Sequence, residues 1–132
     1  MTAKPRVLFA CIHNSGRSVA AQVLTRHYAG DAVDVRSAGS DPGDRVNPIV
    51  AAVLTERGLP VHDHTPTRLD WDLVEGSDVV ITMGCGETCP VFPGRRYEDW
   101  DVEDPAGDIE TVRRIIDDID TRVRHLLTTL PG

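Results

Sequence analysis

The chain has 132 residues with three cysteines, and its 14 basic and 21 acidic side chains give a formal net charge of -7. This length suits one domain with a sizeable core, so residues 1–132 are expected to fold as a single domain. The acidic balance disfavours nucleic acid and anionic membrane surfaces as partners, so any bound anion must be held by local groups.

The cellular setting follows from two further features. No stretch is long enough to span a membrane, and the short apolar run at residues 7–12 continues into polar residues, unlike a secretion signal. An odd number of cysteines without an export signal favours reduced thiols over a disulfide framework. We therefore expect a cytoplasmic protein in which a conspicuous cysteine is catalytic, metal-binding or buried.

The first half of the chain alternates between strand and helix patterns. The apolar run RVLFA at residues 6–10 is typical of a buried strand. Residues 18–30, SVAAQVLTRHYAG, follow helical spacing and end in a glycine. Residues 32–39, AVDVRSAG, alternate as in a strand. Asn47 and Pro48 then open a second predicted helix, with Asn as its cap.

The second half continues the alternation. We expect a short helical segment at residues 69–75, a buried strand at 78–84 and an edge strand at 95–100. The apolar residues of 109–130 recur every three or four positions, which predicts a long amphipathic helix. Alternating strands and helices predict an α/β fold in which helices cover both faces of a parallel sheet.

The motif CIHNSGRS at residues 11–18 stands between the first predicted strand and helix, where open α/β sheets bind ligands. A loop of small residues there turns successive N–H groups toward one point, and the helix N-terminus adds positive potential. Arg17 adds two N–H donors that match a tetrahedral oxyanion. The same field favours the thiolate of Cys11, to which Ser18 can donate. The predicted oxyanion-binding residues are Ile12, His13, Asn14, Ser15, Gly16, Arg17 and Ser18.

Cys11 and the acidic segment near Asp104 each have a simpler interpretation than a catalytic role. Cys11 could be a small buried residue at a strand end, but the full Cys-x5-Arg-Ser pattern favours a catalytic role. A reaction at an oxyanion also needs a proton donor, and Asp104 before Pro105 is the candidate. The competing carboxyl groups are Asp99, Asp101 and Glu103, and the acidic segment could also be ordinary surface.

The segments VLFACIHNSGRS, RSAG, VVITMGCGETCPVFPG and YEDWDVEDPAG together resemble the arsenate reductases of the low-molecular-weight protein tyrosine phosphatase fold. The resemblance covers almost the whole chain. It implies a four-stranded parallel sheet, with Cys11 as nucleophile, Arg17 as anion clamp and Asp104 as general acid. The alternative is a phosphatase of the same fold, and a third option is a domain that binds an oxyanion without turnover.

Two departures from the phosphatase pattern bear on the substrate. Gly16 stands where those phosphatases usually carry a second cysteine, and Ala106 and Gly107 stand where a tyrosine usually flanks an aromatic substrate. The resemblance therefore implies a small inorganic anion, arsenate, with phosphate and sulfate as competitors.

Cys85 and Cys89 supply the redox argument. They lie close together in CGETC, and Gly84 and Gly86 are expected to let this segment move, so the two thiols can come within disulfide reach. The alternatives are packing of one or both cysteines, or a zinc site with His62 and His64.

The resemblance leaves the reductant open. In a thioredoxin-coupled branch, Cys85 attacks the Cys11 adduct and Cys89 passes the disulfide outward. In a mycothiol-coupled branch, mycothiol attacks the Cys11 adduct and a mycoredoxin recycles the mixed disulfide. The sequence MGCGETCP resembles this branch more closely. No tightly bound cofactor is expected.

Some members of the family hold potassium beside the oxyanion loop. Asn14, Gln22 and Ser37 match the positions that would support it, but Gln22 replaces a usual glutamate, so potassium dependence is doubtful. Asn14 and Ser37 would then only brace the loop.

Overall fold

The computed structural model describes residues 4–59, 61, 64–84, 96–105 and 107–130. The described elements follow the expected alternation of strands and helices. They are β1 (Arg6–Cys11), α1 (Arg17–Ala29), the 3-10 turn η1 (Gly30–Ala32), β2 (Asp34–Gly39), α2 (Pro48–Glu56), α3 (Trp71–Glu75), β3 (Val79–Thr82), β4 (Arg96–Asp99) and α4 (Ile109–Thr129).

The strands form one parallel sheet in the order β2-β1-β3-β4, which confirms the predicted α/β fold with a four-stranded sheet. The central strand β1 ends with Cys11 opposite Gly39 of β2 and with Ala10 opposite Thr82 of β3. Because the strands are parallel, all their carboxyl ends meet at one edge of the sheet. The loop that begins after Cys11 lies at this edge.

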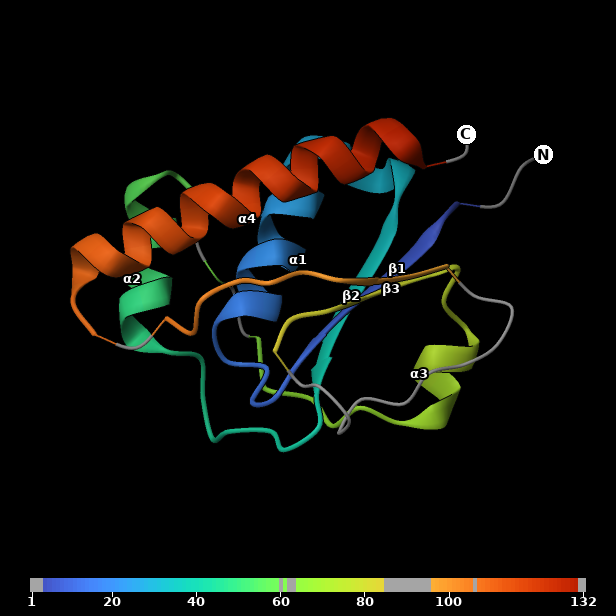
Figure 1. Ribbon diagram of the computed structural model, residues 1–132, viewed down its shortest axis with the longest axis horizontal. Helices are drawn as coiled ribbons and strands as arrows, with labels where there is room; N and C mark the ends of the chain where they lie inside the picture. Colours follow the sequence, from blue (N-terminus) through green and yellow to red (C-terminus); the bar gives the residue numbers. More distant parts are fainter. Residues whose placement is uncertain (1–3, 60, 62–63, 85–95, 106, 131–132) are drawn as a thin grey trace.

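Helices cover both faces of the sheet (Figure 1): α1, α2 and α4 lie on one face and α3 lies on the other. The side chains of β1 alternate accordingly, since successive residues of a strand point to opposite faces. Phe9 joins the large core under α1 and α4, whereas Leu8 packs with Val74 of α3. In the described part of the chain, no helix combines the length and apolar character needed to cross a membrane.

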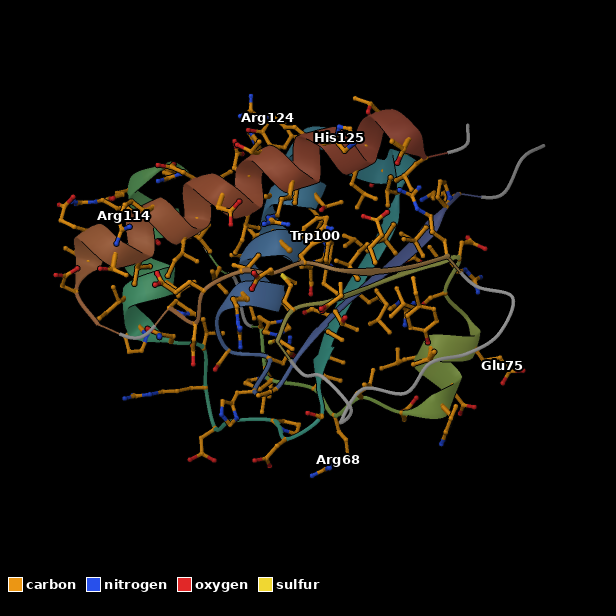
Figure 2. All side chains as sticks on the ribbon, in the orientation of Figure 1. Arg68, Glu75, Trp100, Arg114, Arg124 and His125 are labelled. Carbon is orange, nitrogen blue, oxygen red and sulfur yellow. The ribbon has the colours of Figure 1, made fainter. Side chains whose placement is uncertain are left out.

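Trp100 anchors the chain directly after β4. Its side chain is 5% exposed, and its ring centroid lies 5.6 Å from that of Phe9, between the sheet and the helices (Figure 2). The indole N–H donates to Glu98 Oε1 at 3.1 Å. This buried aromatic pair fixes the point from which the chain runs toward Asp104.

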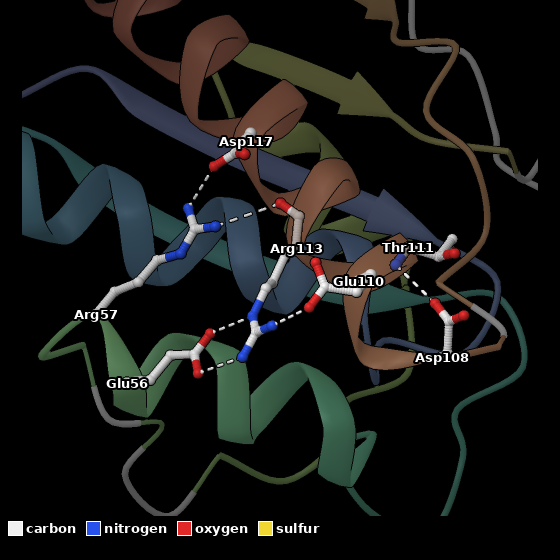
Figure 3. Close-up of polar contacts among 7 residues, drawn as sticks. All are labelled: Glu56, Arg57, Asp108, Glu110, Thr111, Arg113 and Asp117. Atoms are coloured by element: carbon white, nitrogen blue, oxygen red, sulfur yellow. Dashed lines mark hydrogen bonds and ion pairs between the residues drawn. The ribbon is translucent and has the colours of Figure 1, made fainter.

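Charged side chains join α2 to the first half of α4 (Figure 3). Arg113 donates to both carboxylate oxygens of Glu56, at 2.7 and 3.0 Å, and Arg57 pairs with Asp117 at 2.8 Å. The guanidinium of Arg113 lowers the pKa of Glu56 through these hydrogen bonds. These contacts therefore tie the C-terminal end of α2 to α4.

Candidate active site

The loop after β1 is held by its carbonyl groups. Four of them accept hydrogen bonds from the connection between β2 and α2. The pairs are Ser40 N to Cys11 O at 3.1 Å, Asp41 N to Ile12 O at 2.7 Å, Gly43 N to His13 O at 3.0 Å and Asn47 N to Ser15 O at 2.7 Å. In a trans peptide the N–H points opposite to the C=O. The N–H groups of Ile12, His13, Asn14 and Gly16 therefore turn away from this connection, as an oxyanion cradle requires.

The close crossing of this loop over β2 depends on Gly39. A Cβ at Gly39 would lie 2.5 Å from Ile12 O and 2.8 Å from Asn14 N, so no other residue fits without displacing the loop. Asn14 itself adopts φ 49°, a left-handed conformation that asparagine tolerates better than most residues.

Asn14 is fully buried and its side chain joins the loop to distant parts of the chain. Its Nδ2 donates to Ser18 Oγ at 2.8 Å, and its Oδ1 accepts from Thr67 N at 2.9 Å. His64 Nε2 lies 3.0 Å from the same Oδ1 and must be the donor, because a carbonyl oxygen only accepts. These roles of His64 and Thr67 were not predictable from the sequence, because no local pattern links Asn14 to residues 50 and 53 positions away.

Cys11 is 3% exposed, and its Sγ lies 2.9 Å from Ser18 Oγ. Because Ser18 Oγ already accepts from Asn14, its own hydrogen is free to point at the sulfur. A hydroxyl donor and the N-terminus of α1 both stabilise a thiolate at this position. Cys11 and Ser18 thus lie together as the sequence motif predicted.

Arg17, the first residue of α1, is fixed from two sides. Its Nη1 donates to Val102 O at 3.1 Å, and its guanidinium lies against Gly84, where a Cβ would overlap with it. Gly84 also has φ +79°, which favours glycine. Among the described residues, the partner of the Arg17 guanidinium is a neutral carbonyl and no carboxylate pairs with it, so within this part of the chain its charge remains available to an anion.

Asp104 lies on a segment that touches the oxyanion loop on both sides of it. Val102 is buried and accepts the hydrogen bond from Arg17, whereas the buried Pro105 packs on Gly16. Asp104 itself is exposed. This placement fits a carboxyl group that meets solvent and a bound anion.

The competing carboxyl groups are exposed, as Asp104 is. Asp99 accepts a hydrogen bond from the hydroxyl of Thr82 at 2.8 Å. Asp101 and Glu103 are exposed, and the carbonyl of Asp101 is held by Arg122 from α4. Sequence spacing alone did not separate these residues from Asp104.

Several predicted residues fall outside the described part of the chain: Cys85, Cys89, His62 and Ala106. Gly84, the last described residue before Cys85, lies beside Arg17, so the chain leaves the described residues at the edge of the oxyanion site. His64 binds Asn14, and among the described residues no group of three His, Cys, Asp or Glu side chains could hold a metal ion.

The potassium candidates do not fit a cation site in this arrangement. The Oδ1 atom of Asn14 already accepts from His64 and Thr67, and the Oε1 atom of Gln22 accepts the hydroxyl of Ser37. Oxygens whose lone pairs face hydrogen donors are poor ligands for a cation. Asn14 instead holds the loop to Thr67 and His64, and the Gln22–Ser37 hydrogen bond joins α1 to β2.

The chain was compared with known proteins. The family model described as "Low molecular weight phosphotyrosine protein phosphatase" matches residues 6–131. "Arsenate reductase 1" of Bacillus cereus is 32% identical, over 98% of this chain and 98% of its own length. "Arsenate reductase 1" of Staphylococcus haemolyticus is 31% identical, over 96% of this chain and 98% of its own length.

Two solved structures are also similar. One is a thioredoxin-dependent arsenate reductase of Corynebacterium glutamicum, with a TM-score of 0.87 and 45% identity. The match covers 97% of this chain but 62% of that one. The other is an arsenate reductase of Archaeoglobus fulgidus, with a TM-score of 0.78 and 35% identity, covering 92% of this chain and 98% of its own.

His64 makes stability depend on pH. Burial, and then the charge of Arg26, lowers the pKa of His64 below its usual 6.5, so below pH 6.5 the unfolded chain binds more protons than the folded one. The stabilisation is complete above pH 6.5 and is lost as the pH falls toward the folded-state pKa. Urea unfolding at pH 7.5 and 5.5 should show a smaller loss for His64→Gln than for the wild type. An equal reduction in exposed His125→Gln (Figure 2) would contradict this assignment to His64.

Gly84→Ala tests the seat of Arg17. The added Cβ displaces the guanidinium, and we expect inorganic phosphate to bind about tenfold more weakly in calorimetric titration, as for one lost charge-assisted hydrogen bond. Gly58→Ala is the matched control, because Gly58 has φ +76° but no atom within 4 Å of its Cβ position. Both variants lose roughly 1–2 kcal/mol of stability from left-handed alanine. Equal affinity of the Gly84→Ala and Gly58→Ala variants for phosphate would show that the position of Arg17 beside Gly84 does not matter for anion binding.

Proposed function

The chain belongs to the low molecular weight phosphotyrosine protein phosphatase family, and from this premise we propose that it reduces arsenate to arsenite. The observation that carries the proposal is the buried Cys11 sulfur, which lies 2.9 Å from Ser18 Oγ. Cys11 begins the loop whose carbonyl groups bond to the connection between β2 and α2, so that its N–H groups point the other way. The relatives named arsenate reductase, at 31 to 45% identity, support the substrate.

In the first step, arsenate is bound by the loop N–H groups and Arg17. The Cys11 thiolate attacks arsenic while Asp104 gives its proton to the departing hydroxyl group of arsenate, which leaves as water. A sulfur–arsenic bond forms and an arsenic–oxygen bond breaks, so arsenic remains in its +5 state. The loop donors stabilise the negative charge on the remaining oxygens in the transition state.

In the second step, a second thiolate attacks the sulfur of Cys11. A disulfide bond forms, and the electron pair of the sulfur–arsenic bond passes to arsenic, which leaves as arsenite in the +3 state after taking up protons. The two thiols together lose two electrons. An external thiol system must then reduce the disulfide before Cys11 can react again.

The second thiol comes either from Cys85 or from mycothiol. The Corynebacterium relative is thioredoxin-dependent, which supports the branch in which Cys85 attacks and Cys89 passes the disulfide to thioredoxin. The amino-acid sequence of residues 83–90, MGCGETCP, favours mycothiol and mycoredoxin instead. The position of Gly84 beside Arg17 supports a thiol source at residue 85.

A phosphatase is the second candidate, because the family description names that activity. Cys11, Arg17 and Asp104 would suffice for it, and a phosphoryl group would form the same first adduct. The replacement of the tyrosine after Asp-Pro by Ala106 and Gly107 removes the usual wall for an aromatic substrate. We therefore expect arsenate reduction to be much faster than aryl phosphate hydrolysis.

Arsenite production from arsenate tests this proposal. One reaction contains thioredoxin, its reductase and NADPH; a second contains mycothiol and mycoredoxin with their reductase. Turnover in the first that is lost in both Cys85→Ser and Cys89→Ser assigns the internal relay. Turnover only in the second, unchanged in these variants, assigns mycothiol.

Cys11→Ser is the control for both reactions, because it removes the nucleophile and should abolish turnover. Asp104→Asn should lower kcat by about 10²-fold or more, since general acid catalysis contributes at least this much. If the protein hydrolyses p-nitrophenyl phosphate but makes no arsenite in either reaction, the proposed reductase activity is wrong and the phosphatase activity takes its place.

A further inference from the structure

The segment that carries Asp104 is fastened to the oxyanion loop by the next residue, Pro105. A Cβ at Gly16 would lie 2.8 Å from Pro105 Cγ, so the proline ring rests directly on the glycine backbone. The carbonyl of Pro105 accepts a hydrogen bond from Asn47 Nδ2 at 3.2 Å. Both contacts hold the backbone beside Asp104 and leave its side chain exposed.

Asn47 makes three separate connections. Its Oδ1 accepts from Ile49 N at 2.9 Å and Val50 N at 3.4 Å, which caps α2. Its backbone N–H holds the carbonyl of Ser15 at 2.7 Å. Its Nδ2 reaches Pro105. One residue thus joins the start of a helix, the oxyanion loop and the segment with the general acid.

The helix cap alone does not explain an asparagine. Serine, threonine and aspartate cap helices about as well, because a cap needs only an acceptor oxygen. Among these side chains, only asparagine adds an amide N–H₂ group beside the acceptor. That group is the one that binds Pro105.

We propose that Asn47 is a positioning residue for the general acid: its amide holds the carbonyl of Pro105 and so sets the distance between the Asp104 carboxyl and the bound anion. This inference rests on the proposed function, because it takes Asp104 as the proton donor. Asn47 itself does not touch the reacting atoms. Its effect is on the proton-transfer step and not on anion binding.

Asn47→Ser separates the two roles of this side chain, since serine keeps the cap but lacks the amide. We expect kcat for arsenate reduction to fall about tenfold, a part of the general-acid contribution. KM for arsenate should stay within about twofold, because the loop donors and Arg17 are unchanged. Asp70→Ser, the same kind of exchange at the N-cap of α3, is the matched control and should leave both constants unchanged.

A double-mutant cycle with Asp104→Asn tests whether Asn47 acts through the acid. In the Asp104→Asn background, Asn47→Ser should cost nothing further, since there is no proton donor left to position. An equal tenfold loss in both backgrounds, or an unchanged kcat in the single variant, overturns the proposal.

Hydrogen exchange supplies a readout that does not need turnover. In Asn47→Ser, the amides of residues 101–104 should exchange faster than in the wild type, while those of α2 should not. If the wild type makes no arsenite, the proposed function fails, and the exchange result still decides whether Asn47 holds this segment. Unchanged exchange at residues 101–104 overturns the inference.

Discussion

The site depends on one backbone constraint: the carbonyl groups of residues 11, 12, 13 and 15 face the connection from β2 to α2, so the N–H groups of the same peptides point the other way. The connection from β2 to α2 enforces this by donating four backbone N–H groups to them. A single peptide flip would replace an N–H donor in the cradle by a carbonyl oxygen that repels an anion. A segment without any catalytic side chain therefore controls the chemistry of the loop, and Gly39 allows the required close approach.

An acidic protein with a formal net charge of -7 can bind an anion here because the positive field is local. Elsewhere on the described surface, arginines such as Arg57 and Arg113 are paired with carboxylates of α2 and α4. Arg17 instead donates to the carbonyl of Val102, and the N-terminus of α1 lies behind the loop. The dipoles of the loop and helix and the guanidinium of Arg17, which no carboxylate of the described residues neutralises, act over a few ångströms, whereas distant surface charge is screened by salt.

The sequence predicted the strands, the helices and the position of the loop after the first strand because each is encoded in a local pattern. The capping role of Asn47 was also readable, since it needs only neighbouring residues. Contacts between remote segments were not readable: nothing local marks His64 as the partner of Asn14, or Pro105 as the partner of Asn47. The backbone N–H groups that hold the loop were not predictable either, because almost every residue type carries the same backbone N–H. Gly84 was expected to serve mobility, but its described contact with Arg17 gives it a packing reason.

The helix α2 is fixed at both of its ends to the part of the chain that carries Asp104 and α4. Asn47 begins α2, and the segment with Asp104 leads into α4. The ion pairs of Glu56 and Arg57 tie the far end of α2 to α4 (Figure 3). The Asn47 contact with Pro105 and these ion pairs therefore hold opposite ends of α2 against the segment that leads into α4 and against α4 itself.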